Sequence, residues 1–203
     1  MAEKTDRAPK EKSHHQGKLE KAVLEKSVAT TFNEAKKEWD LLYIYKQAQG
    51  GVCICGHSPI VDHCVLRNHL NSRRLVVGNV CVEKFNSEQF QLSSLAFKCL
   101  GNMKKDEKKR ANDALLKFAR DQGLITEKDY NFYSEVRLKR RRISGKQRDY
   151  IDSLNKTMVF AFTHPPQICK GCEQHVWAKQ SRAGKLYYRC NPCSVFLDAE
   201  TTN

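Results

Sequence analysis

Apolar residues recur at helical spacing through the middle of the chain, and this pattern predicts a helical region over residues 87–158. The clearest examples are residues 87–103 and 106–123, where one side of each expected helix would be apolar. Thr126 and Ser144 are each followed, three residues later, by a side chain that can complete a capping pair. These two positions therefore predict two further helix starts.

A different pattern precedes this region. Residues 31–39 suit a short helix, whereas residues 40–45 form an apolar and aromatic run that is typical of a strand. Two more apolar runs, at residues 65–70 and 74–80, flank a polar turn and predict a hairpin. The expected fold class is α+β: a small β-hairpin module stabilised by zinc, a helical segment, and a C-terminal zinc ribbon.

Composition along the chain predicts four parts. Residues 1–27 are polar and have hardly any apolar periodicity, so we expect a disordered or loosely helical tail. Residues 28–158 are expected to form an α+β domain that includes the basic helical segment. Two consecutive prolines mark residues 159–167 as a linker, because prolines cannot continue a helix, and residues 168–203 follow as a separate small unit.

The strongest chemical signal is a pair of Cys-x-x-Cys motifs near the C-terminus. Each motif places two sulfurs within reach of one ion, and the spacing between the motifs is typical of a zinc site. The expected ligands are Cys169, Cys172, Cys190 and Cys193. Four sulfurs leave no position for water, so the ion would be structural. The alternative is a redox motif, which needs a full domain around it that this short segment lacks.

A second cysteine group occurs earlier in the chain, where a Cys-x-Cys-Gly sequence predicts a tight turn. The expected ligands of a second zinc ion are Cys53, Cys55, Cys64 and Cys81. His57 and His63 compete for the fourth position, because imidazole also suits zinc. The alternative for this group is a cluster of buried free thiols, and Cys99 is interpreted in that way.

Both cysteine groups carry resemblances. The strings CKGC, GKLYYRC and NPCSVFLDA resemble zinc ribbons and, more loosely, the C-terminal zinc modules of topoisomerases and the GRF-type fingers. That resemblance implies contact with nucleic acid, usually single strands. The strings CICGHSPI and VVGNVCVEKF resemble a zinc-binding module found in uncharacterised viral, phage and microbial proteins, over residues 35–158. This second resemblance implies zinc but no particular activity.

Charge points to a polyanionic partner. The formal net charge is +13, and one run of cations has no acid within it. Its members are Arg137, Lys139, Arg140, Arg141, Arg142, Lys146 and Arg148. Cations this close repel one another unless phosphates neutralise them, so we expect the run to bind nucleic acid, or to serve as a nuclear import signal in a eukaryotic host. An earlier basic cluster, residues 104–110, contains acids and is interpreted as a solvated face.

The C-terminal hairpin adds a predicted binding face. A three-residue loop at residues 182–184 would place Ser181 opposite Lys185, and opposed residues share a face of the sheet. Continuing this register puts five long side chains on one face, where aromatic rings can stack bases and cations can hold phosphates. They are Trp177, Lys179, Lys185, Tyr187 and Arg189. The alternatives are that the aromatic residues only cover the zinc core, or that a four-residue loop shifts the register.

These observations predict a non-catalytic accessory protein of replication, recombination or transcription that binds nucleic acid, preferably single strands. A rival function is an adaptor whose zinc modules dock on a polymerase or another protein. An HNH-type nuclease is weaker, because no metal-binding histidine follows Asn68 at a useful spacing. No apolar segment suggests a signal peptide or a membrane span, so we expect an intracellular protein, nuclear in a eukaryote.

Overall fold

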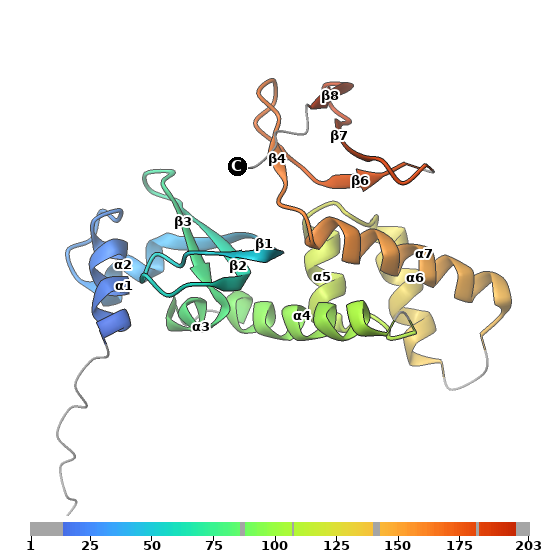
Figure 1. Ribbon diagram of the computed structural model, residues 1–203, viewed down its shortest axis with the longest axis horizontal. Helices are drawn as coiled ribbons and strands as arrows, with labels where there is room; N and C mark the ends of the chain where they lie inside the picture. The colour runs from blue at the N-terminus through green and yellow to red at the C-terminus, as the bar shows by residue number, and fades with distance from the viewer. Residues whose placement is uncertain (1–13, 86–87, 107, 140–142, 182, 198–203) are drawn as a thin grey trace, which may run out of the picture.

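The computed structural model describes residues 14–85, 88–106, 108–139, 143–181 and 183–197. The fold is α+β, and its N-terminal half is built on a three-stranded antiparallel sheet in the order β1-β2-β3. Two helices and a 3₁₀ turn lead into this sheet (Figure 1). The elements are α1 (His14–Leu24), α2 (Phe32–Ala35), the turn Lys36–Glu38, β1 (Trp39–Gly51), β2 (Ile60–Asn68) and β3 (Arg74–Gly78).

The sheet is followed by a helical half. A long helix, α4, begins beneath the sheet and runs away from it, and α5, α6 and α7 lie along and beyond it (Figure 1). The elements are α3 (Asn79–Val82), the 3₁₀ turn Glu83–Phe85, α4 (Glu88–Lys105), α5 (Asp113–Asp121), α6 (Glu127–Leu138) and α7 (Gly145–Phe162). The helical region predicted over residues 87–158 is therefore observed as four helices with short breaks.

Capping explains two of these helix starts. The Thr126 side chain accepts a hydrogen bond from Asp129 N, and the Asp129 carboxylate accepts one from Thr126 N. Ser144 and Gln147 form the same reciprocal pair at the start of α7. Each pair satisfies two backbone N–H groups that have no partner within the helix. Both predicted capping pairs are confirmed.

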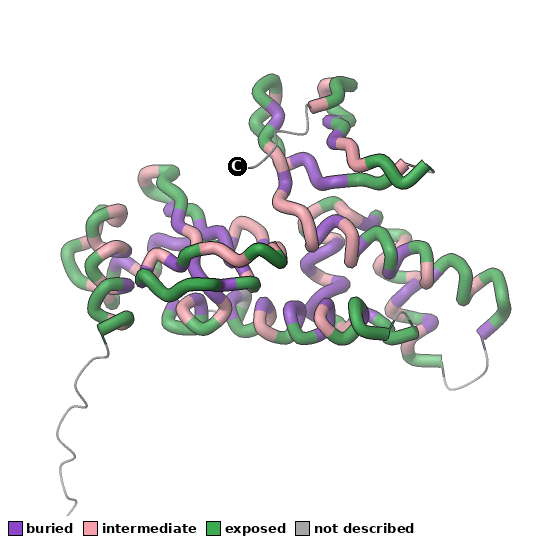
Figure 2. Tube along the Cα trace, viewed as in Figure 1, coloured by how far each residue is buried: buried purple, intermediate pink, exposed green. Residues whose placement is uncertain are grey.

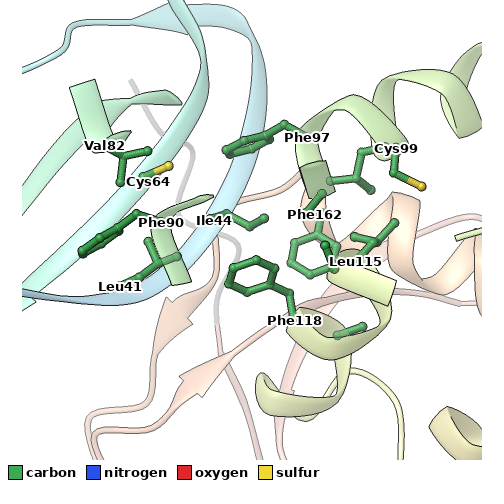
Figure 3. Packing of buried hydrophobic residues seen from close by; sticks show 14 of the residues in the cluster. Leu41, Ile44, Cys64, Val82, Phe90, Phe97, Cys99, Leu115, Phe118 and Phe162 are labelled. Carbon is green, nitrogen blue, oxygen red and sulfur yellow. The ribbon is translucent and has the colours of Figure 1, made fainter. Parts of the chain in front are cut away.

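One hydrophobic core joins the sheet to the helices. Ile44 of β1 lies near Phe97 of α4, Phe118 of α5 and Phe162 of α7 (Figure 3). All four side chains are buried, and the buried positions concentrate where the two halves of the molecule meet (Figure 2). The sheet and the helical segment therefore form one packed body.

Helix α1 belongs to the same core. Leu19 and Val23, four residues apart, are buried, although the sequence predicts a disordered or loosely helical tail over residues 1–27. Residues at i and i+4 lie on one side of a helix, so two apolar side chains suffice to attach it. The segment before His14 lies outside the described residues. The sequence did not predict that α1 packs against the core, because the helix is mostly polar and only these two of its residues are buried.

A buried carboxylate fixes the connection between α1 and the sheet. Glu38 accepts hydrogen bonds from Val28 N, Ala29 N and Asn68 Nδ2, at 2.9, 2.6 and 2.6 Å. Burial acts to raise the pKa of Glu38, but these hydrogen bonds together outweigh it and hold the pKa below its usual value of 4.5. The carboxylate therefore favours its charged form in the folded chain.

The C-terminal module lies over α7 and contains two small sheets (Figure 1). Its strands are β4 (Gln167–Ile168), β5 (His175–Val176), β6 (Ala178–Gln180), β7 (Leu186–Cys190) and β8 (Val195–Leu197). The Trp177 ring lies 5.3 Å from Phe162 and 6.0 Å from Tyr43, between centroids. Helix α7 also continues to Phe162, within the segment predicted as a linker. The module is thus packed against the body through its tryptophan.

Candidate metal centres

The C-terminal module brings four sulfurs together. Cys169 follows β4, Cys172 lies in the next turn, Cys190 ends β7 and Cys193 lies in the turn before β8. Their sulfur atoms all lie within 4.8 Å of one another. Four sulfurs bound tetrahedrally to one ion at about 2.3 Å would be roughly 3.8 Å apart, so the arrangement fits a thiolate metal site. The structure brings together all four residues predicted for this cluster.

Local backbone geometry prepares this site for a cation. The N–H groups of Gly171 and Cys172 donate to Cys169 and lower the pKa of its thiol to about 7, against the effect of burial. Hydrogen bonds with Cys172 and Cys169 raise the pKa of Cys193 to about 12. Without an ion the cluster therefore retains thiol protons, and metal binding would release them.

The N-terminal cluster contains three sulfurs. Those of Cys53, Cys55 and Cys81 lie within 4.8 Å of one another, and Cys55 and Cys81 are 3.4 Å apart. The turn that carries the first two is held by a hydrogen bond from Cys53 N to His57 O, at 2.9 Å. Gly56 has a φ of +82°, a conformation that a side chain would resist. Helix α3 delivers the third sulfur.

Electrostatics in this cluster favour one thiolate. The Cys81 thiol is the main hydrogen-bond donor to Cys53, and with the N–H groups of Cys55 and Gly78 it lowers the pKa of Cys53 to about 5. The same hydrogen bond raises the pKa of Cys81. The site therefore stabilises negative charge on sulfur, as a cation site requires.

Cys64 lies outside the cluster, which corrects its predicted role as a ligand. It lies on β2 opposite Val77, is fully buried, and its thiol points to Ser93 Oγ at 3.9 Å. Figure 3 shows it beside Val82 and Phe90. Burial raises the pKa of its thiol to about 12. It behaves as a small hydrophobic residue, which was the alternative for this group, and Cys99 is also buried and free.

His63 is likewise not in position to complete the site. Its ring stacks on Tyr45 at 4.6 Å between centroids, and its Nδ1 atom lies 3.0 Å from Val61 O. Burial lowers its pKa, so it is held neutral. Gly51 is required here, because a Cβ atom at this position would lie 2.4 Å from His63 Nε2.

Two other histidines lie at the turn that carries Cys53 and Cys55, outside the three-sulfur cluster. His57 follows the cysteine turn, and its ring lies 5.6 Å from that of His15, between centroids. The Nδ1 atom of His15 lies 3.1 Å from Cys55 O. Sequence reasoning considered His57 but missed His15, because nothing in the pattern brings α1 to this turn.

The residues considered for a nuclease have structural partners. Asn68 is fully buried, and its Oδ1 atom accepts hydrogen bonds from Leu70 N and Asn71 N, at 2.8 and 3.2 Å. Its amide nitrogen donates to Glu38. Asn68 therefore closes the turn between β2 and β3.

The C-terminal hairpin has the predicted register. Lys179 pairs with Tyr187, Ser181 N donates to Lys185 O at 2.9 Å, and Gly184 has a φ of +80°. Tyr188 pairs with Ala178, which excludes the four-residue loop that would have placed it opposite Trp177. The three-residue loop is thus confirmed, and its first residue, 182, lies outside the described residues.

Trp177 does not join the hairpin face. It is 5% exposed and belongs to the main core, so it is not available to stack a base. Phe196 takes that place: it pairs with Arg189 and is 67% exposed. Its ring lies 6.0 Å from the Tyr187 ring and 5.5 Å from Arg189 Cζ. The sequence did not place Phe196 on this face, because strand β8 was not predicted.

The predicted basic run divides into two sets. Arg137 pairs with Asp113, and Lys139 Nζ lies 2.8 Å from a Glu135 oxygen. Residues 140–142, which hold three of the arginines, lie outside the described residues. Lys146 and Arg148 are exposed on the first turns of α7. The described part of the run is thus partly neutralised by local acids.

Comparison with known proteins identifies no relative: no family model, no curated protein and no solved structure matches this chain. Among the described residues, no helix has both the length and the apolar character needed to span a bilayer. Fold and site must therefore be interpreted from their own residues.

Proposed function

We propose that this chain is a non-catalytic nucleic-acid-binding protein whose two cysteine clusters hold structural zinc ions. The donor sets support zinc, because sulfur-rich sites with small separations suit a soft ion of tetrahedral preference. The C-terminal ion has Cys169, Cys172, Cys190 and Cys193 as ligands, and the module resembles a zinc ribbon.

The N-terminal ion has three cysteine ligands and one histidine. Cys53, Cys55 and Cys81 supply the sulfurs, and we assign the fourth position to His57 or His15, which lie at the turn that carries Cys53 and Cys55. If Nδ1 of His15 donates to Cys55 O, its Nε2 atom is the unprotonated nitrogen that a metal requires. Either histidine closes the ion against water and keeps the site structural.

The observation that carries nucleic-acid binding is an exposed aromatic and basic face on the C-terminal module. Phe196 and Tyr187 lie beside Arg189, and Lys179 lies opposite Tyr187. Lys185, two residues before Tyr187, alternates onto the same face. Rings that stack bases beside cations that hold phosphates make a surface for single strands, at roughly 1–3 kcal/mol for each stacked base.

A binding series tests this function. The zinc-loaded chain is titrated with labelled single-stranded and duplex DNA and RNA at two salt concentrations, after its zinc content is measured. We expect two zinc ions per chain, a preference for single strands, and affinity that falls steeply with salt. Phe196→Ala should weaken binding. Leu70→Ala, an equally exposed apolar residue on the β2–β3 turn, is the control and should not.

The exposed apolar surface also favours a second function. Phe196 is 67% exposed, and such a residue can dock on a polymerase or another protein. An adaptor of this kind would bind nucleic acid weakly and without preference for single strands. Its association with the protein partner would depend little on salt, which separates the two functions.

A further inference from the structure

An open groove of about 940 Å³ lies between the end of α4, the connection to α5, and α7. Its apolar lining residues are Met103, Ile143 and Ile151, which are buried, and Val159 and Phe160, which are half-buried. Among the described residues, five cations line it, against one acid, Asp152. The cations are Lys104, Lys108, Arg110, Arg148 and Lys156.

These cations keep their charges available. All five are exposed, and none forms an ion pair within the part of the chain that the structure describes. The Asp106 carboxylate accepts a hydrogen bond from the Lys108 backbone N–H, at 3.0 Å. Within residues 104–110, the described acid, Asp106, forms no ion pair with a described cation, and Glu107 lies outside the described residues.

A buried polar network holds the basic segment against α7. Ala111 N donates to the Tyr133 hydroxyl at 2.8 Å, and that hydroxyl donates to Asn155 Oδ1 at 2.7 Å. Asn155 Nδ2 in turn donates to Lys109 O at 3.3 Å. Because these groups are buried and satisfied, the backbone that carries Lys108 and Arg110 has a fixed position at the groove wall.

The groove continues to the hairpin face. Asp152, Lys156, Phe160 and Gln180 line both this groove and a second one between α7 and the C-terminal hairpin. The second groove also includes Lys179 and Tyr187, which belong to the face described above. One path therefore leads from the end of α4, along α7, to the aromatic residues of the hairpin.

We infer that a single nucleic-acid strand binds along this path, with its phosphates on the cations of the helical groove and its bases on Val159, Phe160 and the hairpin face. The inference rests on the proposed function and adds a second site to it. Charge complementarity identifies a polyanion, and the half-buried Val159 and Phe160, with the aromatic residues of the hairpin face, favour unpaired bases, which a duplex does not expose. Asp152 accepts hydrogen bonds from base amino groups, as acids do in base recognition.

The test compares two triple variants of the zinc-loaded chain. In the groove variant, Lys104, Lys108 and Arg110 become alanine; in the control, the exposed Lys84, Lys98 and Lys128 do, with the same loss of charge. We expect the groove variant to bind single strands roughly 10- to 100-fold more weakly, and its salt slope to flatten by about 2, since each phosphate contact on a single strand contributes about 0.7. Its affinity should also stay the same when the oligonucleotide is shortened, because only the hairpin face still binds the strand.

The outcomes separate this inference from the proposed function. If the unmodified chain binds no nucleic acid, the proposed function fails. If it binds, and Phe196→Ala weakens binding while the groove variant matches the charge control, the helical groove is not a site and the inference is overturned. Zinc content and thermal unfolding check folding, and the exposed pair Arg148→Ala and Lys156→Ala provides a second groove variant on α7.

Discussion

The two cysteine clusters differ in what surrounds them. Around the C-terminal sulfurs, the buried cluster of described residues consists of Cys169, Val176, Ala178, Tyr188 and Cys190, so two of its members are themselves candidate ligands. Cys53 and Cys55 instead belong to the core that joins the sheet, the helices and α1. A core this small cannot offset the entropy of ordering its module without further stabilisation. The C-terminal module is therefore expected to need its metal ion in order to fold. The N-terminal region is expected to fold without the ion, which would only order the turn around its cysteines.

Metal removal should separate the two regions most strongly. Structural zinc contributes about 10–16 kcal/mol of apparent binding free energy in small modules, so chelation should unfold residues 167–197. The body should keep its helices, because its core does not depend on the ion. Amide hydrogen exchange of the zinc-loaded and chelated chain measures both regions at once. Protection of β6 and β7 that survives chelation would contradict the expected dependence on metal.

The tryptophan that connects the two regions gives the next largest effect. Trp177→Ala removes a buried ring from the main core and should cost about 3–5 kcal/mol. It should also detach the C-terminal module from α7 while leaving its zinc bound. Phe196→Ala, at an exposed aromatic residue, is the control and should leave stability within about 0.5 kcal/mol of the unmodified chain. Equal stability of the two variants would argue against the observed docking.

Cys64 and Cys81 distinguish a core thiol from a ligand within one region. Cys81→Ala should reduce the zinc content from two ions to one. Cys64→Ala should keep two ions and cost about 1–2 kcal/mol of stability, because it leaves a small cavity beside Phe90. Elemental analysis with denaturant unfolding measures both. Loss of one ion in Cys64→Ala would restore Cys64 as a ligand.

The same contrast explains how far the sequence could predict the sites. Both C-terminal Cys-x-x-Cys motifs and the hairpin loop are set by local geometry, so spacing alone predicted the cluster and the register. The N-terminal cluster depends on tertiary packing. Strand alternation directs Cys64 toward Ser93 of α4, and no spacing rule reveals that direction before the sheet is placed on the helix.

For the helices too, features set by neighbouring residues were predictable and features set by tertiary packing were not. The caps at Thr126 and Ser144 act within four residues, and both were predicted. Helix α1 and Trp177 required knowledge of the surface they meet, and their own patterns did not supply it. By strand alternation, Trp177 lies on the same face of the hairpin as the exposed Lys179. It is nevertheless covered by Phe162 and Tyr43 of the main body. Residues at contacts between regions were therefore the ones mistaken.

The fourth ligand of the N-terminal site can be assigned by paired variants. The double variant His15→Ala with His57→Ala should weaken zinc binding at this site by at least about 10- to 100-fold. Loss of a side chain that only orients a metal ligand already has an effect of that size. The single variants then identify which imidazole is bound. Cobalt substitution gives the readout, because one nitrogen and three sulfurs absorb differently from four sulfurs. A double variant with unchanged affinity and spectrum would exclude both histidines.

The smallest expected effect concerns Glu38, which stabilises the N-terminal region without metal. Its pKa is depressed in the folded chain, so its contribution is fully present above the unfolded value of 4.5 and is lost as pH falls through the folded value. Glu38→Gln should lower stability at neutral pH by about 1–2 kcal/mol, because the amide replaces a charged acceptor. When the pH is lowered from neutral into the acid range, the free energy of unfolding should fall less for the variant than for the unmodified chain. Both are measured on chelated protein, so that acid release of zinc does not contribute. Parallel stability curves below pH 4.5 would show that Glu38 is not the group that titrates there.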